Sequence, residues 1–236
     1  MTPQLLASVM EATWPAAAQH PCGPFLLRDG QGGGKRVSAA TAEGNWSGDD
    51  IEAAEASMRG MGQDALFLIR AGDDALDQAL AERGYRRVDP VVAYAAPATV
   101  VAGEGPDHMS TFPHWPPMAI AVDLWAEGGI GAARLAVMQR VAGPKCAILS
   151  RANDRPTGVA FVAAQGKVAM LHALEVASRH RRQGSAHNIL RAAARWALDQ
   201  GCDTLSLVVT EANQPARALY ASLGMSVVGH YHYRQN

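Results

Sequence analysis

The sequence predicts an α/β fold in which a mixed central sheet is flanked by helices. Two observations predict it. Apolar segments of strand length alternate along the chain with amphipathic segments of helix length. One strand, 167–176, is apolar on both faces, which is typical of a strand in the middle of a covered sheet. Of the 236 residues 48% are hydrophobic and only 6% aromatic, so mainly aliphatic side chains must fill the core.

The helices are predicted from apolar positions three and four residues apart and from capping residues at their ends. Ser47, with Asp49 and Asp50, begins one helix, and Asn213 caps another. Gly84 and Gly224 end two helices, because glycine adopts the left-handed backbone of a helix stop without strain. The predicted helices cover 1–14, 47–61, 73–83, 118–126, 131–141, 184–200 and 213–223.

The strands are predicted from short apolar runs bounded by turn residues. They cover 36–42, 65–69, 86–95, 145–151, 158–165, 167–176, 204–209 and 225–233. Turns at 153–156 and 165–167 make 145–176 a three-strand meander. The glycines at 30–34 indicate a flexible turn; a phosphate loop would need a following Gly-Lys-Ser/Thr, which is missing. The segment 98–117 is rich in Pro, Gly and polar residues, which favours a linker or long loop.

Two stretches of the chain share one order of elements. Strand, helix, strand, helix and strand follow one another at 36–95 and again at 168–233. A shift of 139 to 140 residues carries Gly62 onto Gly201 and Gly84 onto Gly224. We interpret this as an internal repeat, the alternative being a chance likeness of two β-α-β-α-β runs. The predicted organisation is a half-domain at 1–97, a linker at 98–117 and a complete domain at 118–236.

Composition excludes several classes of protein. The 21 Lys and Arg residues nearly balance 22 Asp and Glu, which argues against a nucleic-acid partner or a membrane surface. The N-terminus lacks the basic region of a signal peptide. Three separated cysteines support neither a disulfide framework nor a metal site. We therefore expect a cytoplasmic protein without a bound metal.

The most informative segment joins the buried strand 167–176 to the helix 184–200. Three arginines and a histidine lie at 179–182, just before Gly184. Free N–H groups at a helix N-terminus attract anions, and glycine allows close approach to the backbone. In a chain of net charge −1 this cluster indicates a pyrophosphate site. The alternative is a solvated basic loop before an ordinary helix.

Two motifs in this region resemble a known family. Arg181-x-x-Gly184-x-Ala186 matches the Arg/Gln-x-x-Gly-x-Gly/Ala loop of the GNAT superfamily of acetyl-CoA-dependent N-acetyltransferases. The segment from Asn213 to Met225 resembles the Asn-x-x-Ala-x-x-Leu-Tyr-x-x-x-Gly-Phe/Met segment of the same superfamily, at its usual separation. The resemblance covers 118–236. It departs where Arg182 and Ala186 stand in place of frequent glycines.

The resemblance implies a GNAT fold, in which the strands 167–176 and 204–209 are parallel and splay apart. It implies that pantetheine bonds to the backbone in the opening and that the pyrophosphate lies on the loop. It also implies that Tyr220 protonates the departing thiolate, although a packed tyrosine is the alternative. Asn213 is expected as a helix cap first and a cofactor contact second. The implied cofactor-binding residues are Leu174, Glu175, Val176, Arg181, Arg182, Gln183, Gly184, Ser185, Ala186, Asn213 and Tyr220.

A base must also be found for the acceptor amine. Glu175 is the carboxylate near the end of the central strand, and we assign it as base or amine-orienting group, against the alternative of an inert rim position. His172 is expected to be a core histidine, and His230 and His232 are secondary candidates.

The predicted function is transfer of an acetyl group from acetyl-CoA to a primary amine by direct transfer. The alternative is a non-catalytic acyl-CoA-binding sensor or scaffold. A nucleotide-binding protein is disfavoured, because no acidic ribose ligand follows the loop. The expected partner is a small-molecule or peptide amine, and a homodimer is left open.

The residues 1–97 form a degenerate GNAT-like half without a cofactor, because 41–46 lacks the basic cluster and Leu80 replaces the tyrosine.

Overall fold

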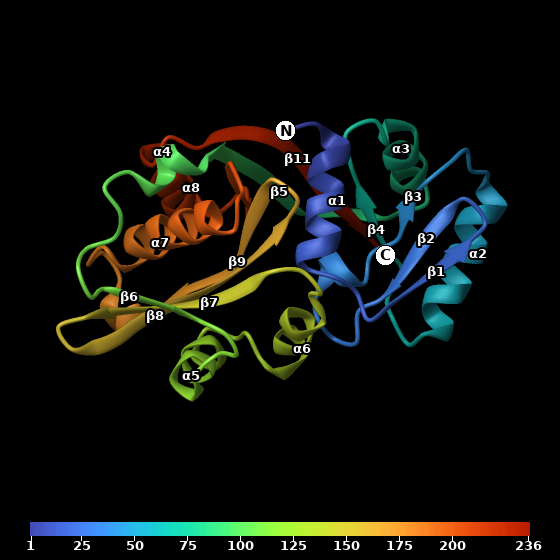
Figure 1. Ribbon diagram of the computed structural model, residues 1–236. Coiled ribbons are helices and arrows are strands. Elements are labelled where there is room, and N and C mark those ends of the chain that lie inside the picture. The colour runs from blue at the N-terminus through green and yellow to red at the C-terminus, as the bar shows by residue number, and fades with distance from the viewer.

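One mixed sheet of eight strands runs through most of the molecule. The computed structural model describes residues 1–236 (Figure 1). The strands lie across the sheet in the order β4-β11-β5-β10-β9-β8-β7-β6. Their bounds are β4 (Leu66–Ile69), β5 (Arg86–Pro97), β6 (Thr111–His114), β7 (Lys145–Ala152), β8 (Arg155–Gln165), β9 (Val168–Val176), β10 (Thr204–Thr210) and β11 (Ser226–Gln235). This is the predicted mixed sheet flanked by helices.

Helices cover both faces of this sheet. One face packs against α4 (Ala98–Ala102), α7 (Ser185–Asp199) and α8 (Gln214–Ser222). The other face packs against α5 (Ala119–Glu127), α6 (Ala132–Arg140) and the end of α1 (Pro3–Thr13). Alternation along β8 serves both layers: Val159 and Phe161 belong to the second, Ala160 and Val162 to the first. Both faces of the central strands are therefore buried, as their apolar sequences predict.

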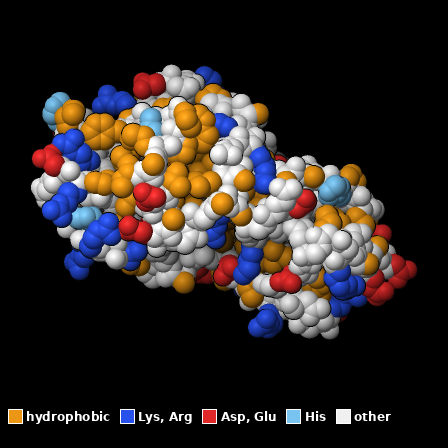
Figure 2. Space-filling model, turned by 90° about the horizontal axis from the view of Figure 1, so that it is seen from below, with side chains coloured by type: hydrophobic (Ala, Val, Ile, Leu, Met, Phe, Trp, Pro, Cys, Tyr) orange, Lys and Arg blue, Asp and Glu red, His pale blue; other side chains and the backbone are white.

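The smaller lobe is built from the first part of the chain. It holds an antiparallel sheet of β1 (Ala18–Cys22), β2 (Phe25–Asp29) and β3 (Thr41–Ala42), with α2 (Gly48–Gly60) and α3 (Asp74–Glu82) packed beside it (Figure 1). Figure 2 shows the same elongated outline from below, with hydrophobic side chains gathered on the larger lobe, where α5 lies. No helix has the length and apolar character needed to cross a bilayer.

The two halves exchange their last strands. β5 comes from the first half but lies between β10 and β11, while β11 lies beside β4. Leu68 pairs with Tyr233, and Leu207 pairs with Tyr94, in antiparallel register. A shift of 139 residues carries Leu68 onto Leu207 and Tyr94 onto Tyr233, so both pairs follow one register. The internal repeat is thus an exchanged arrangement, and the main sheet crosses the predicted boundary at residue 97.

The predicted helices form within two residues of their predicted ends. Three segments differ. The hairpin of β1 and β2 was not predicted, because β1 is short, largely exposed and contains Pro21. The expected linker 98–117 contains α4, which buries Ala98 and Val101, and β6, which pairs with β7. In the segment expected as a strand at 36–42, η1 (Lys35–Val37) forms a single 3-10 turn and only β3 is extended.

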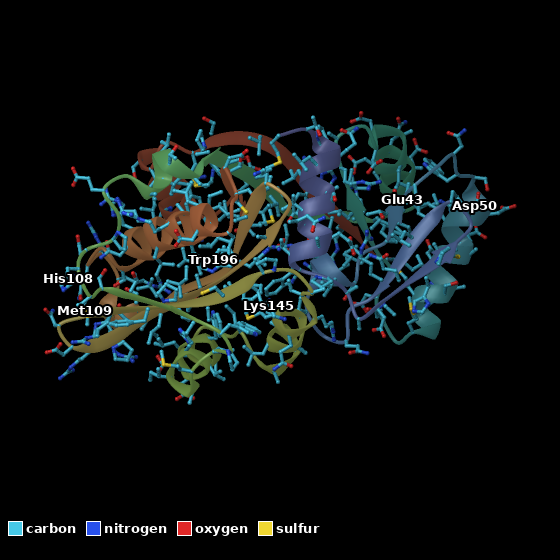
Figure 3. All side chains as sticks on the ribbon, viewed as in Figure 1. Glu43, Asp50, His108, Met109, Lys145 and Trp196 are labelled. Atoms are coloured by element: carbon cyan, nitrogen blue, oxygen red, sulfur yellow. The ribbon has the colours of Figure 1, made fainter.

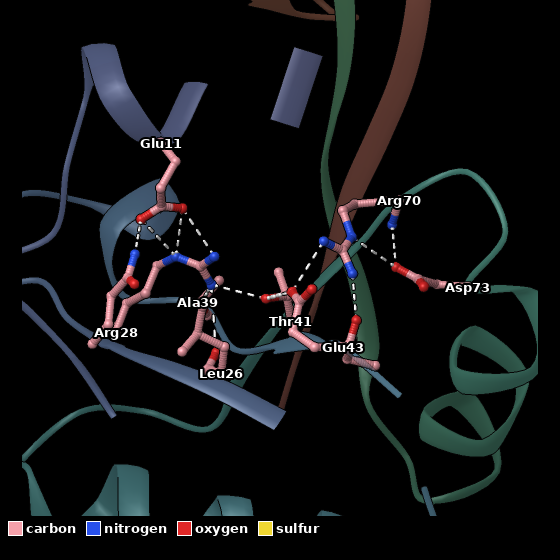
Figure 4. Close-up of polar contacts among 10 residues, drawn as sticks. Glu11, Leu26, Arg28, Ala39, Thr41, Glu43, Arg70 and Asp73 are labelled. Carbon is pink, nitrogen blue, oxygen red and sulfur yellow. Dashed lines mark hydrogen bonds and ion pairs between the residues drawn. The ribbon is translucent and has the colours of Figure 1, made fainter. Parts of the chain in front are cut away.

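A polar network joins α1 to the smaller lobe (Figure 4). Arg28 on β2 is 6% exposed and donates to both carboxylate oxygens of Glu11, with Nη2 2.9 Å from Oε2. Its Nη1 donates to the carbonyl of Ala39 at 3.0 Å and to the hydroxyl of Thr41 at 3.1 Å. The Thr41 hydroxyl donates to Glu43, which also pairs with Arg70. One buried guanidinium therefore connects a helix, two strands and a neighbouring ion pair.

We expect Arg28→Met to lower the free energy of unfolding by about 2 kcal/mol, because it leaves the Ala39 carbonyl without its donor. The estimate lies below that for a fully buried pair, since the Glu11 side chain is 35% exposed. Urea unfolding followed by circular dichroism measures the change. Arg59→Met is the control, since Arg59 is 61% exposed in its pair with Glu55 and its loss should change stability little. Equal stability of the two variants would contradict a structural role for the network.

A second ion cluster holds the exchanged strand β11 against α3. Asp77 Oδ1 accepts from Arg234 Nε at 2.7 Å and lies 2.7 Å from His232 Nε2. The hydrogen bond from Arg234 lowers the pKa of Asp77, with a smaller contribution from His232. Because the pKa is lower in the folded state, the stabilisation is present above the unfolded pKa of about 3.9 and is lost as pH falls through the folded value.

Wild-type protein is therefore expected to exceed Asp77→Asn in stability by about 1 kcal/mol at pH 7, and the difference should vanish as the pH falls through the lowered pKa of Asp77. Urea unfolding of both proteins at a series of pH values measures it. A difference independent of pH would show that the Asp77 charge does not stabilise β11.

Candidate functional site

The parallel pair β9 and β10 opens part of the way along the sheet. The two strands pair from Val168 with Thr204 to Leu171 with Leu207, and no pair follows. Beyond this point β9 still pairs with β8, and β10 with β5. The last residues of β9, including Leu174, Glu175 and Val176, therefore present a backbone edge to the opening. This is the splay that the sequence resemblance predicts.

A bulge in β9 begins at the splay. Ala173 has a φ of +50°, and the pairing of β9 with β8 shifts by one residue there. The Trp125 indole Nε1 donates to the carbonyl of Ala173 at 2.8 Å and so provides this bulged residue with a partner outside the sheet. Sequence reasoning did not predict this bulge or its contact with Trp125. The only signal was His172, a polar residue that interrupts the apolar run of the strand.

The loop before α7 presents a row of free backbone donors. Gly184 has a φ of +84° and begins the helix without any side-chain cap, and Arg182 has a φ of +64°. The N–H groups of 182–187 donate to no acceptor within the protein, and the first amide bonded to the loop is that of Asn188, which donates to the Gly184 carbonyl. Such a row of amides at a helix N-terminus binds anions. We call the N–H groups of 182–187 the amide cradle.

The matching helix of the first half has no such cradle. At the start of α2 the Ser47 hydroxyl accepts from the Asp50 amide, while the Asp50 carboxylate accepts from the Ser47 amide at 2.8 Å. Figure 3 shows Asp50 at this position in the smaller lobe. The hydrogen bonds from Ser47 also lower the pKa of Asp50, so its carboxylate stays charged there. This helix end is thus closed by its own carboxylate.

The arginines of the basic loop differ in their partners. Arg179 pairs with Glu127 at 2.9 Å. Arg181 donates to the Val176 carbonyl at 3.2 Å and lies 3.4 Å from Glu175 Oε1. Arg182 pairs with no carboxylate. Two of the three charges predicted for an anion site are thus shared with acidic neighbours, although their side chains remain largely exposed.

Glu175 lies beside the turn that joins α5 to α6. Its side chain is 21% exposed and packs against Gly128, where an added Cβ would come 2.4 Å from the Glu175 Cγ. With Ala177, Ser178 and Arg181 it lines a cavity of about 300 Å³. The structure thus places Glu175 at the end of β9, and its role as a base stays a prediction.

Tyr220 lies in the core on the face covered by α7 and α8. It is 5% exposed, and its ring centroid is 5.7 Å from that of Tyr94. Burial and the neighbouring Tyr94 raise the pKa of Tyr220 to about 12. Leu174 and Val209, at the splay, pack against the same core cluster. Asn213 caps α8 by accepting from the Ala216 amide at 3.2 Å, as predicted.

A larger cavity lies at the splay. It has a volume of about 520 Å³, and we call it the splay cavity. Its floor includes His172 and Ala173 of β9 and Val208–Thr210 of β10. Its walls come from both halves of the chain: Trp14 and 33–36 from the first, Ile130, Arg134, Tyr231 and Tyr233 from the second. Sequence reasoning did not find this cavity, because its lining comes from seven separate segments.

Two of the three candidate histidines, His172 and His232, are occupied by structural contacts, whereas His230 is exposed. His172 is 4% exposed. Its Nε2 lies 2.9 Å from the hydroxyl of Thr13, which donates to the Val9 carbonyl, so Nε2 must carry the proton. Its Nδ1 therefore accepts from Arg36, at 2.9 Å. Burial and Arg36 hold the pKa of His172 well below its usual range, so it is a neutral core histidine, as expected. His232 is paired with Asp77.

The splayed parallel pair and the uncapped glycine loop define an acyltransferase of the GNAT class. Residues 105–225 match the acetyltransferase (GNAT) family, and the chain belongs to this family. It is also 26% identical over 234 residues to the uncharacterized N-acetyltransferase YobR of Bacillus subtilis (strain 168), a match that covers 94% of each chain.

Solved structures share the fold. A GCN5-related N-acetyltransferase from Kribbella flavida superposes with a TM-score of 0.75 at 17% identity, over 100% of this chain and 95% of the other. A tandem GNAT protein from the clavulanic acid biosynthesis pathway superposes with a TM-score of 0.63 at 15% identity, over 98% of this chain and 87% of the other. The second likeness agrees with the repeat seen in the order of elements.

Proposed function

We propose that this protein transfers an acetyl group from acetyl-CoA to a primary amine by direct transfer. The observation that carries the proposal is the amide cradle at the end of a strand that splays from its parallel neighbour. The cradle fits a pyrophosphate, because six consecutive N–H groups, 182–187, have no acceptor in the protein. The exposed edge of β9 beyond Leu171 fits the amide groups of pantetheine.

The residues proposed to hold acetyl-CoA are those of the loop and the strand end. Arg181, Arg182, Gln183, Gly184, Ser185 and Ala186 would bind the pyrophosphate, mainly through the backbone. Leu174, Glu175 and Val176 would bind the pantetheine. The thioester would then lie at the splay, between the Tyr220 face of the sheet and the splay cavity on the other face.

The chemistry follows from this placement. The acceptor nitrogen attacks the thioester carbon, the C–S bond breaks, and the sulfur leaves with the electron pair. With a pKa raised to about 12, Tyr220 stays protonated at neutral pH and can donate to the sulfur as charge develops there. Glu175 is the proposed acceptor of the amine proton, and Arg181 holds its carboxylate in place.

Calorimetric titration with CoA and a CoA-release assay test the proposal. We expect one CoA bound per chain, because the matching helix end of the first half is closed by Asp50. We also expect acetyl-CoA-dependent turnover with at least one member of an amine panel. CoA binding without turnover on any amine would favour the non-catalytic sensor. Absence of CoA binding would overturn both the acetyltransferase and the sensor hypotheses.

A further inference from the structure

The splay cavity contains an arginine that no carboxylate neutralises. Arg36 follows the glycine-rich turn of the first half and lines the cavity. Its guanidinium carbon lies 5.7 Å from the centroid of the Trp14 ring. Nη1 donates to His172, but Nε is buried and donates to no acceptor. The Arg36 side chain is partly buried, and a guanidinium in such a place without a counter-charge favours an anion that completes the site.

The contact with His172 does not supply that counter-charge. The Thr13 hydroxyl fixes the proton of the imidazole on Nε2, so Nδ1 offers Arg36 a lone pair but no negative charge. The histidine therefore orients the guanidinium while leaving its full charge in the cavity. Stacking on Trp14 restricts it further. An arginine held in this way from two sides is preorganised to bind an anion.

The other charged groups of the lining add to the positive charge. Asp89 is the cavity's one acidic residue, and it is already paired with Lys35 at 2.6 Å. Arg134, on α6, lies against Gly34 and forms no ion pair. Three basic side chains thus face one acidic one. Apart from His172, Thr210 and two glycines, the remaining walls are apolar or aromatic, including Ile130, Val208 and the tyrosines of β11.

We propose that the acceptor is an amine that also carries a carboxylate, and that Arg36, with Arg134, binds this carboxylate. The inference rests on the proposed acetyl transfer, since it identifies the class of amine that would occupy the splay cavity. A planar guanidinium pairs well with the two oxygens of a carboxylate. The size of the cavity, about 520 Å³, suits an amino acid or a short peptide end with an apolar side chain.

Matched acceptor pairs test this specificity. The probes are the proteinogenic amino acids and their carboxamides, which keep the amine and lose the charge. With acetyl-CoA present, wild-type protein should use the best amino acid with a kcat/KM about 10- to 100-fold above that of its amide, the range expected for a charge-assisted hydrogen bond. In Arg36→Gln this preference should fall to about 3-fold or less, through KM rather than kcat.

The variants separate binding from folding. Gln at position 36 can still donate to His172 but carries no charge, whereas Arg36→Lys keeps the charge and should retain part of the preference. Arg140→Gln is the control for the loss of an arginine charge outside the cavity. Arg140 lies on α6, as Arg134 does, but it is bonded to Gln31 and does not line the cavity. It should behave as wild type. The KM for acetyl-CoA should stay the same in every variant.

A binding measurement keeps the inference independent of turnover. Calorimetry of CoA-loaded protein with the same acid and amide probes should show tighter binding of the acid in wild type and equal binding in Arg36→Gln. If CoA binds and the acid preference appears without turnover, the proposed transfer fails while the carboxylate site stands. If no acid binds or reacts better than its amide, or if Arg36→Gln keeps the preference, the carboxylate site is wrong.

Discussion

Tyr220→Phe is expected to lower kcat for acetyl transfer about 100-fold, the lower end of the range for a general acid. The KM for acetyl-CoA should change little, because the hydroxyl acts on the sulfur only as the C–S bond breaks. Steady-state CoA release over a range of acetyl-CoA concentrations measures both constants. Since burial raises the pKa of Tyr220 to about 12, its ionisation should not appear in the pH profile of kcat below about pH 11.

Tyr94→Phe is the control for that experiment. The Tyr94 ring packs at a tilt of 58° against that of Tyr220 in the same core cluster, and the two substitutions remove one hydroxyl each. The Tyr94 hydroxyl, however, accepts from Arg217 at 3.2 Å. We expect kcat of this variant within about threefold of wild type, because the lost bond is not made to the reacting atoms. Equal kcat in Tyr220→Phe and wild type would remove the acid role and leave Tyr220 as a packed core residue.

The sequence predicts the parts of this fold whose signals are local. Helix and strand ends follow from periodicity and from caps such as Asn213, and the loop before α7 follows from a glycine with neighbouring arginines. The exchange of β5 and β11 has no such signal. Either last strand would bury the same apolar pattern beside β4 or β10, because the two halves share one register. Only the packing of the whole chain decides between the two pairings.

The candidate site divides in the same way. The proposed cofactor side is built from contiguous segments, so the motifs at 181–186 and 213–225 could indicate it. The proposed acceptor side is lined by residues from separate segments, among them Trp14, the turn before η1, the α5–α6 turn and β11. Arg36 becomes notable only because Trp14 and His172 contact it, and these three residues are far apart in sequence. The residues next to Arg36 in the sequence do not indicate that it binds a ligand.

A carboxylate like the one that caps α2 can be introduced at the amide cradle. Asp50 is the third residue of α2, and its carboxylate accepts from the amide of the capping residue Ser47. His187 holds the same third position in α7, after the cap Gly184. His187→Asp should therefore place a carboxylate over the cradle and raise the KM for acetyl-CoA about 10- to 100-fold, because that carboxylate competes with the pyrophosphate for the same donors.

The same substitution should stabilise the free protein. Higher stability together with weaker binding of acetyl-CoA makes the test specific, because a variant that merely misfolds would lose both. A carboxylate in the first turn of a helix contributes about 0.3–1 kcal/mol, and the introduced carboxylate would also stand four residues before Arg191. His187→Asn is the control, since it places a neutral side chain of similar size there and should move KM and melting temperature much less. If His187→Asp raises the melting temperature but leaves the KM for acetyl-CoA unchanged, the free amides are not the cofactor's anion site. If His187→Asp raises both the melting temperature and the KM for acetyl-CoA, a carboxylate at the third helix position is enough to explain why α2 would not bind a cofactor where α7 is proposed to.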